Sequence, residues 1–264
     1  MLDLARAAWG YRGFILGSVQ REFQARYRNS MLGAVWVVLN PLAMIAVYTL
    51  VFSQLMKARL PGVDSEFAYS IYLCAGIFAW GLFAEITTRA QTMFLDNANL
   101  LKKLSFPRIC LPIIVVISAT LNFAIIFGLF SGFLLLSGHF PGLVYVAVLP
   151  LLLLQTAFAI GLGMTLGVLN VFFRDVGQFF GILLQFWFWL TPIVYSATIV
   201  PPTARPLLEL NPLTALITAW QGIFVNAAWP HWSSLLPLSL LTLLLCSAGL
   251  LLFRRRAGEL VDEL

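Results

Sequence analysis

The sequence predicts an all-α integral membrane protein with six transmembrane helices per subunit. Hydrophobic residues make up 61% of the 264 residues and charged residues only 10%, which is far from the composition of a soluble domain. Several charge-free runs are longer than the roughly 20 apolar residues that a helix needs to cross a bilayer. Such runs include 29–56, 109–138, 176–204 and 210–253.

Basic residues alternate between the segments that connect the expected spans, which are 32–56, 68–95, 109–136, 143–170, 176–197 and 233–253. Of the 16 lysines and arginines, 13 lie before span one, around the connections after spans two and four, or after span six. Only Lys57, Arg59 and Arg205 lie on the other side. Cytoplasmic segments of membrane proteins carry the excess of positive charge. We therefore expect both termini in the cytoplasm and an even number of crossings.

A further apolar segment, 212–228, would make the number of crossings odd if it spanned the membrane. We interpret it as a re-entrant helix that enters the membrane from the outer side and returns there. Such backbone is stable at membrane depth only where protein buries it or where it lines a wet cavity. The alternative is a helix that lies on the outer membrane surface, and the sequence is compatible with both.

The first 30 residues predict an amphipathic helix at the membrane interface. Its apolar residues recur at spacings of seven, three, four and four, which places them on one helical face: Trp9, Leu16, Val19, Phe23 and Tyr27. Arginines project from its other faces, as is typical of a helix in the lipid headgroup layer. Such a helix is a topological anchor or, alternatively, part of a platform for a cytoplasmic partner or an anionic headgroup.

Two cytoplasmic connections combine charged and apolar residues in a pattern that indicates contact with another protein. The positions expected to form this contact are Leu100, Leu101, Lys102, Lys103, Leu104, Phe106, Arg174 and Asp175. A loop that only sets topology needs positive charge but no apolar face beside it. The first connection therefore predicts a short helix that inserts into a groove on a partner protein.

Several stretches together resemble a known family, in order and with matching loop lengths. They are REFQARYRNSMLGAVWVVLNP (21–41), LLKKLSFPRICLP (100–112), FFRDVGQF (172–179) with WFWLTPIVY (187–195), LNPLTALI (210–217) and FRRRAGELVDEL (253–264). The chain resembles the membrane subunit of ABC exporters of lipid-linked polysaccharides, namely the O-antigen, capsule and teichoic-acid permeases. The similarity covers nearly the whole chain.

This resemblance implies a homodimer of six-helix subunits in the bacterial inner membrane, joined to two cytoplasmic ABC ATPase subunits. It also implies an interfacial N-terminal helix, a coupling helix after span two, and outer-side gate helices between spans five and six. The sequence holds no G-x-x-x-x-G-K-[ST] motif, so we expect ATP and Mg²⁺ on the partner and no cofactor on this chain. Because the positive charges lie between spans, membrane lipids are expected partners and nucleic acid is not.

We expect one permease domain over residues 1–264. Its expected parts are an interfacial helix (1–30), spans one to five (32–197), an outer-side gate segment (198–232), span six (233–253) and a cytoplasmic tail (254–264).

Aromatic side chains in spans one, two and five predict a conduit at the homodimer seam, because sugar rings stack their C–H faces on aromatic rings. The expected lining residues are Tyr48, Phe52, Trp80, Phe83, Glu85, Trp187, Trp189 and Tyr195. The alternative interpretation is that the tryptophans mark the membrane interfaces and the phenylalanines face lipid.

Glu85 and Arg89 are four residues apart, so they share a helix face and can form an ion pair. Charged residues within spans are costly and are treated as functional by default. We interpret this pair as structural or as part of a polar channel entrance, with a proton relay as the alternative. Arg26, Arg28 and Arg89 are expected to attract the phosphate or pyrophosphate headgroup of a lipid-linked glycan.

Other functions stay open from the sequence alone. An ABC permease for a small drug or haem is the closest alternative. A membrane-embedded enzyme of envelope synthesis is a further one, although the sequence places no pair of acidic or metal-binding groups together within the spans. We therefore expect a non-catalytic transport subunit.

Overall fold

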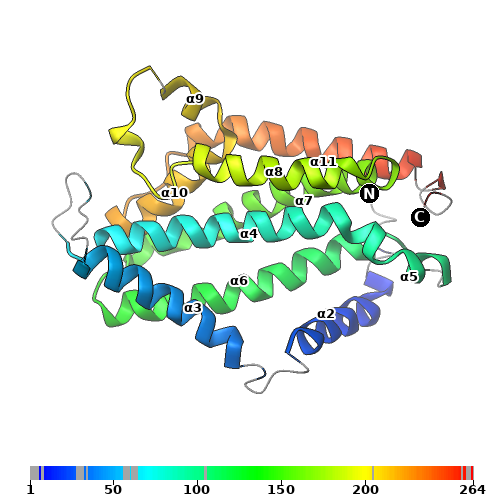
Figure 1. Ribbon diagram of the computed structural model, residues 1–264, viewed down its shortest axis with the longest axis horizontal. Coiled ribbons are helices and arrows are strands. Elements are labelled where there is room, and N and C mark those ends of the chain that lie inside the picture. The colour runs from blue at the N-terminus through cyan, green and yellow to red at the C-terminus, as the bar shows by residue number, and fades with distance from the viewer. Residues whose placement is uncertain are drawn as a thin grey trace.

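Helix α4 (Ala68–Asp96) lies at the centre of an all-helical bundle in this computed structural model (Figure 1). It contacts α3 (Val35–Tyr48), α6 (Cys110–Leu136), α7 (Val148–Phe172), α8 (Asp175–Leu190) and α10 (Pro212–Asn226). Most side chains of α4 are buried, since helices cover it on several sides. Helix α11 (Leu236–Arg256) packs on α7, on the far side of α7 from α4.

The structure describes residues 6, 9–27, 33, 35–55, 60, 65–103, 106–203, 205–256, 258–259 and 263, without the side chains of 26–27 and 53–55. Within these residues there is no strand, in agreement with the predicted all-α class. The remaining elements are α2 (Arg12–Tyr27), η1 (Thr49–Leu55), α5 (Ala98–Lys103), η2 (Gly142–Ala147), η3 (Ala197–Ile199), α9 (Arg205–Leu210) and η4 (Trp232–Leu235).

Five helical segments are long and apolar enough to cross a membrane: Val35–Phe52, Ala68–Asp96, Cys110–Leu136, Gly142–Phe172 and Trp232–Arg256. The fifth predicted span, 176–197, is shorter in the structure because α8 has 16 residues and ends at Leu190. The next residue, Thr191, is extended, with φ −105° and ψ 135°. Pro192 explains this end, because proline disfavours helical backbone at the residue before it.

Helix α2 runs alongside α6, and both begin at the same end of the bundle (Figure 1). Ile15 and Val19 of α2 are buried in a cluster with Cys110 and Ile114 of α6. Of the predicted apolar face of α2, Val19 packs on α6, whereas Leu16 is 60% exposed and open to lipid. Ile15, which the apolar periodicity did not include, also packs on α6.

Helix α3 packs loosely on the bundle. Only 11% of the residues in its membrane-crossing segment, Val35–Phe52, are buried. Pro41 lies inside it, and its last turns widen into the π-helix η1. A proline inside a helix removes one backbone hydrogen bond and a π-segment shifts the register, so both changes loosen the contact of this span with its neighbours.

Helix α10 begins with the Asn211 side chain accepting a hydrogen bond from Leu213 N, followed by Pro212 in the first turn. These are favoured residues at a helix N-terminus. Its end is marked by Ala227, which has φ +47°. One face of α10 is buried against α4 and α7, with Leu216 and Trp220 at 0% and 1% exposure.

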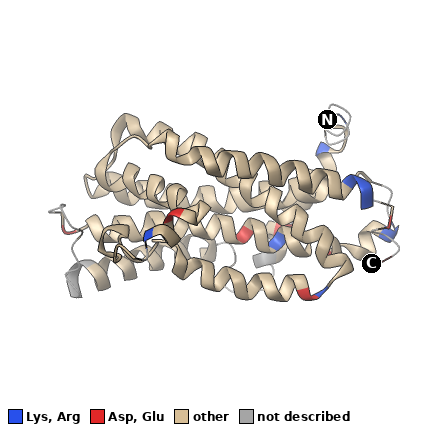
Figure 2. Ribbon diagram, turned by 90° about the horizontal axis from the view of Figure 1, so that it is seen from above, with Lys and Arg blue, Asp and Glu red and all other residues tan. Residues whose placement is uncertain are grey.

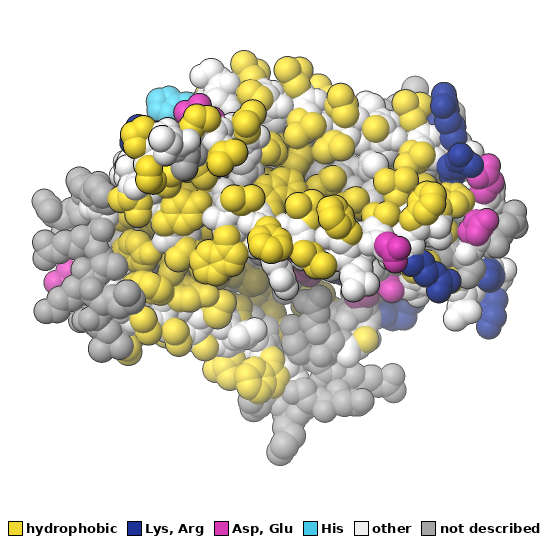
Figure 3. Space-filling view, turned by 45° about the horizontal axis from the view of Figure 1, so that its top comes forward, with side chains coloured by type: hydrophobic (Ala, Val, Ile, Leu, Met, Phe, Trp, Pro, Cys, Tyr) yellow, Lys and Arg dark blue, Asp and Glu magenta, His cyan; other side chains and the backbone are white. Residues whose placement is uncertain are grey.

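Charge is distributed unevenly along the bundle. Lysines and arginines gather mainly at the end where α5 lies and α11 terminates (Figure 2). The middle of the face in Figure 3 is covered by hydrophobic side chains, and most of its visible charged side chains lie at one end. This arrangement is typical of a bundle with its apolar middle in a bilayer.

Candidate functional site

Helix α5 forms an exposed projection at the charged end of the bundle (Figure 1). Lys102 and Lys103 are exposed, whereas the Leu100 and Leu101 side chains are half-buried. Phe106 lies farther in and packs on Phe14 of α2, with ring centroids 4.9 Å apart. Leu104 lies outside the described residues. The predicted contact segment therefore has an outer basic side and an inner apolar side that contacts α2.

The turn between α7 and α8 lies at the same end and exposes Arg174 and Asp175. The buried Asn170 side chain holds this turn, because its Oδ1 accepts from Gly177 N at 2.9 Å and its Nδ2 donates to Gln91 O at 3.0 Å. Phe173 is 66% exposed beside the two charged residues, and the sequence interpretation did not include it. The turn therefore exposes one large apolar ring beside its two charged residues.

The end of α11 lies against the same turn. The Arg256 guanidinium lies 5.7 Å from the centroid of the Phe172 ring and also pairs with Glu259. Cation–π contact of this kind orders a long side chain on an exposed surface. The connections after spans two and four and the last helix therefore present basic and aromatic groups at one end of the molecule.

Four predicted conduit residues differ in how the structure places them. Trp80 and Phe83 of α4 are buried, at 8% and 1% exposure, whereas Trp189 of α8 is 65% exposed. Trp187 is half-buried and contacts both α4 rings, at centroid distances of 6.5 Å to Trp80 and 5.4 Å to Phe83. Phe83 also stacks on Phe158 of α7 at 5.6 Å, so it belongs to the interior of the subunit.

A second aromatic group lies at the end of α3. Tyr48 and Phe52 are half-buried neighbours with centroids 6.4 Å apart, and Phe52 lies 5.3 Å from Tyr69 of α4. Tyr48 and Phe52 make no ring contact with Trp80 or Trp187, so these predicted conduit residues lie in two separate aromatic groups.

The segment after α8 is held in place by side chains from two other helices. Tyr72 of α4 donates to Pro192 O at 3.0 Å and to Tyr195 O at 2.8 Å. Gln221 of α10 donates to Pro192 O at 3.1 Å. The predicted conduit residue Tyr195 in turn donates its hydroxyl to Trp189 O at 3.0 Å. The non-helical backbone after α8 is thus satisfied by hydrogen bonds from protein side chains.

A cluster of charged and polar side chains joins α2, α4 and α6. The predicted pair is present, since Arg89 Nη1 and Glu85 Oε1 are 3.6 Å apart. Arg89 Nη2 also contacts Glu22 Oε2 of α2 at 2.5 Å, and Asn122 donates to Glu85 Oε2 at 2.8 Å. Ser118 donates to the same Glu22 oxygen at 2.6 Å.

The sequence interpretation missed three members of this cluster, namely Glu22, Ser118 and Asn122. The signal for two of them was available, because Ser118 and Asn122 are polar residues four apart in an apolar helix and therefore share one face. The other predicted headgroup residues are not described: Arg28 lies outside the described residues, and so does the side chain of Arg26.

Comparison with known proteins decides the family. The model of the ABC-2 type transporter family matches residues 15–225, which covers most of the chain. The chain belongs to the ABC-2 type transporter family.

Several named transport proteins are similar to the chain over most of its length. It is 32% identical over 266 residues to the O-antigen export system permease protein RfbA of Myxococcus xanthus, with 100% of both chains covered. RfbA of Klebsiella pneumoniae is 32% identical over 207 residues, 78% of each chain. The polysialic acid transport protein KpsM of Escherichia coli is 22% identical over 244 residues, 92% of this chain and 93% of KpsM.

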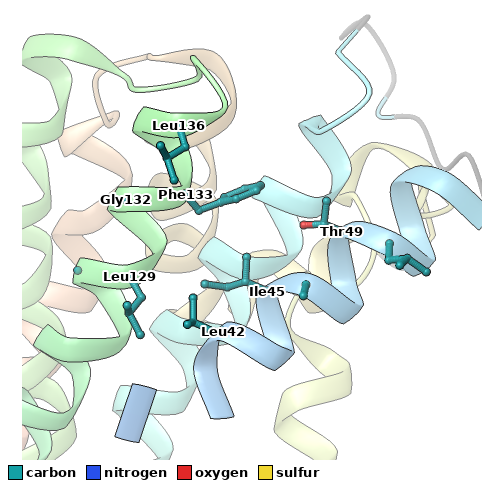
Figure 4. Close-up of a pocket in the computed structure, with 10 residues that line it drawn as sticks. Leu42, Ile45, Thr49, Leu129, Gly132, Phe133 and Leu136 are labelled. Atoms are coloured by element: carbon teal, nitrogen blue, oxygen red, sulfur yellow. The ribbon is translucent and has the colours of Figure 1, made fainter. Parts of the chain in front are cut away.

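The grooves lined by α6 on this ABC-2 transporter subunit include two that are mainly apolar. One, of about 670 Å³, lies between α3 and α6, and Figure 4 shows Leu42 and Ile45 of α3 across it from Leu129 and Phe133 of α6. Its lining is apolar apart from Thr49. The other, of about 520 Å³, lies between α2 and α6. Grooves of this composition accept hydrocarbon and exclude charged groups.

Metal chemistry finds no support in the described part of the chain. No group of three His, Cys, Asp or Glu side chains that could hold a metal ion occurs among the described residues.

Proposed function

We propose that this chain is the transmembrane permease subunit of an ATP-driven exporter that moves a lipid-linked polysaccharide across the bacterial inner membrane. The observation that carries this proposal is the 32% identity to the O-antigen permease RfbA over 100% of both chains. The similarity to KpsM, a polysialic acid transport protein, supports a polysaccharide as the cargo. In this proposal two copies of the chain join two cytoplasmic ATPase subunits, which bind ATP and Mg²⁺.

Six crossings per subunit form part of this proposal, although α8 is short. Its 16 residues extend about 24 Å at 1.5 Å per residue, less than the roughly 30 Å of a bilayer core. In this proposal the crossing continues through the buried residues 191–193, where the extended Thr191 is followed by a turn. Tyr72 and Gln221 satisfy the backbone of this segment, and irregular backbone is tolerated at membrane depth where protein buries it.

The burial of α10 side chains supports the interpretation of this helix as re-entrant. Trp220 and Leu216 are buried against the bundle, whereas a helix lying on the membrane surface would contact lipid along that face. With the basic end of the bundle in the cytoplasm, α10 lies toward the outer end. We therefore propose it as an outer gate, with both chain termini in the cytoplasm.

The proposed conduit runs along the surface between α3 and α8. Its lining groups are the half-buried or exposed members of the predicted set: Tyr48, Phe52, Glu85, Trp187, Trp189 and Tyr195. Trp80 and Phe83 support Trp187 from behind, because they are buried in contact with it. Sugar rings stacking on this surface would slide from one aromatic group to the next.

The experiment is deletion of this gene in a strain that makes the polysaccharide, followed by complementation. We expect the polymer to accumulate inside the deletion strain and to return to the surface with the parent gene. A tagged chain should also purify with an ATPase subunit. Normal surface polysaccharide in the deletion strain, or a purified chain that hydrolyses ATP alone, would contradict the proposal.

A further inference from the structure

Glu22 of α2 sits in a socket formed by two other helices. Its Oε2 atom accepts from Arg89 Nη2 of α4 at 2.5 Å and from Ser118 Oγ of α6 at 2.6 Å. Arg89 and Glu22 remain partly accessible, with 24% and 42% of their side-chain surface exposed. A guanidinium and a hydroxyl that donate to one oxygen form the kind of site that binds an oxyanion.

The socket lies near the edge of the expected hydrocarbon layer. Helix α4 has 29 residues, about 43 Å at 1.5 Å per residue, which exceeds a bilayer core by about 13 Å. Arg89 is seven residues before the end of α4 at Asp96, or about 10 Å from its charged end. Lipid phosphates lie just outside the hydrocarbon layer, so a phosphate at this depth is within reach of Arg89.

Arg89 has hydrogen-bonding capacity that the carboxylate of Glu22 does not use. Its Nη1 is buried and has no hydrogen-bond partner in the described part of the chain, although Glu85 is an ionic neighbour at 3.6 Å. A phosphate offers several acceptor oxygens and can engage both terminal nitrogens of a guanidinium. Exchange of the Glu22 carboxylate for a phosphate group keeps an anion beside Arg89, with a charge of about −1 for a diester and between about −1 and −2 for a monoester.

An apolar groove begins within one helical turn of the socket. It has a volume of about 520 Å³ and is lined by Leu16, Val19, Gln20 and Phe23 of α2 and by Leu121, Ala124 and Ile125 of α6. Phe23 follows Glu22 in the chain, and Leu121 is three residues after Ser118. A phosphate in the socket would therefore have a hydrocarbon-compatible surface directly beside it.

We propose that the Arg89–Ser118 socket is a binding site for a phosphate carried on a hydrocarbon chain, and that Glu22 occupies it until that phosphate displaces the carboxylate. Displacement removes the polar anchor of α2 and frees this helix from α4 and α6. The hydrocarbon then lies in the groove between α2 and α6. The identification of this lipid as the transported substrate rests on the proposed function, but the site itself does not.

Opposite effects of two substitutions test this exchange. The purified complex with its ATPase is incubated with a polyprenyl phosphate, and bound lipid is measured by native mass spectrometry. Glu22→Gln weakens the competing anion, so it should bind the lipid about tenfold more tightly. Arg89→Gln removes the main donor and should bind it at least about tenfold more weakly. Arg21→Gln, on the exposed side of α2, should bind like the parent.

The choice of lipid identifies the recognised group and its source. The unphosphorylated polyprenol of equal length should not compete. Phosphatidylglycerol that competes fully would support the site and assign it to bulk membrane lipid, whereas competition by polyprenyl phosphate alone assigns it to the carrier lipid. Equal binding of polyprenol and polyprenyl phosphate, or weaker binding in Glu22→Gln, overturns the proposal. Because these measurements need no export, they can fail while the proposed function holds.

A second measurement follows α2 itself. Val19→Cys and Ile114→Cys are introduced together with Cys110→Ala, since Val19 and Ile114 belong to one buried cluster. Polyprenyl phosphate should slow disulfide formation between the two cysteines several-fold, and added Glu22→Gln should slow it without lipid. If neither polyprenyl phosphate nor Glu22→Gln changes the rate of disulfide formation, α2 does not separate from α6, and the displacement step is overturned.

Discussion

Trp187 of α8 donates its indole N–H to Asn211 Oδ1 at 2.8 Å. Asn211 is also the N-cap of α10, because the same oxygen accepts from Leu213 N at 3.0 Å. Its Nδ2 donates to Thr191 Oγ1 at 2.9 Å, at the end of α8. One side chain thus connects a proposed conduit residue, the end of α8 and the proposed gate helix, so movement of α8 should be transmitted to α10.

Trp187→Phe tests this connection. The substitution keeps an aromatic ring but removes the N–H donor, so we expect the purified subunit to lose about 1 kcal/mol of unfolding free energy. We also expect slower export, because α8 and α10 would no longer move together. Trp189→Phe is the control, since Trp189 is 65% exposed and its indole N–H makes no hydrogen bond within the described part of the chain. Equal losses in both variants would show that ring size matters and the hydrogen bond does not.

Gly167→Ala tests the close packing of α7 on α4. A Cβ atom at Gly167 would lie 2.5 Å from Ala90 O, which is backbone and cannot move aside. We expect this variant to lose about 1–3 kcal/mol of unfolding free energy, measured by denaturation in detergent.

Gly128→Ala is the matched control, because nothing lies within 4 Å of its Cβ position. There the higher helix propensity of alanine should leave stability unchanged or raise it by up to about 1 kcal/mol. A loss at position 128 as large as at 167 would contradict the packing argument.

The sequence predicted interactions between near neighbours better than interactions across the fold. The Glu85–Arg89 pair followed from a spacing of four residues, and the structure confirms it at 3.6 Å. Its third member, Glu22, is 67 residues away from Arg89, and only the packing of α2 on α4 and α6 brings it there. Periodicity placed Leu16 and Val19 on one apolar face of α2, but it could not show that α6 covers Val19 and leaves Leu16 exposed.

The positions where helices end show the same difference between local and long-range interactions. Composition predicted a fifth span over 176–197, yet α8 ends at Leu190 because Pro192 fixes the backbone before it. Pro192 was visible in the sequence, but the sequence did not show which side chains stabilise the non-helical backbone around it inside the bundle. Tyr72 and Gln221, which supply these hydrogen bonds, come from α4 and α10.

Tyr72→Phe tests whether these bonds hold the segment after α8. The change removes one hydroxyl that donates to Pro192 O and Tyr195 O, and leaves the ring in place. Because Pro192 keeps its bond from Gln221, we expect a loss of about 1–2 kcal/mol in unfolding free energy, mainly from the Tyr195 side. A cysteine at position 196 should also react faster with a water-soluble maleimide. Tyr69→Phe, which removes only the bond to Val194 O, should have a smaller effect, and the reverse order would contradict this assignment.

Lys102→Glu with Lys103→Glu tests the role of α5 in ATPase binding. Both side chains are exposed at the charged end of the bundle, whereas the neighbouring leucines are half-buried, so charge reversal should leave the fold intact. We expect the ATPase subunit to bind about tenfold more weakly, roughly 1.4 kcal/mol, and the difference from the parent to shrink as salt is raised. Binding is measured by titration of the purified ATPase onto the subunit in nanodiscs.

Arg205→Glu, at the opposite end, is the control because it changes the net charge without touching this surface. If Arg205→Glu weakens binding as much, or if the double variant binds normally at low salt, the ATPase does not dock on α5.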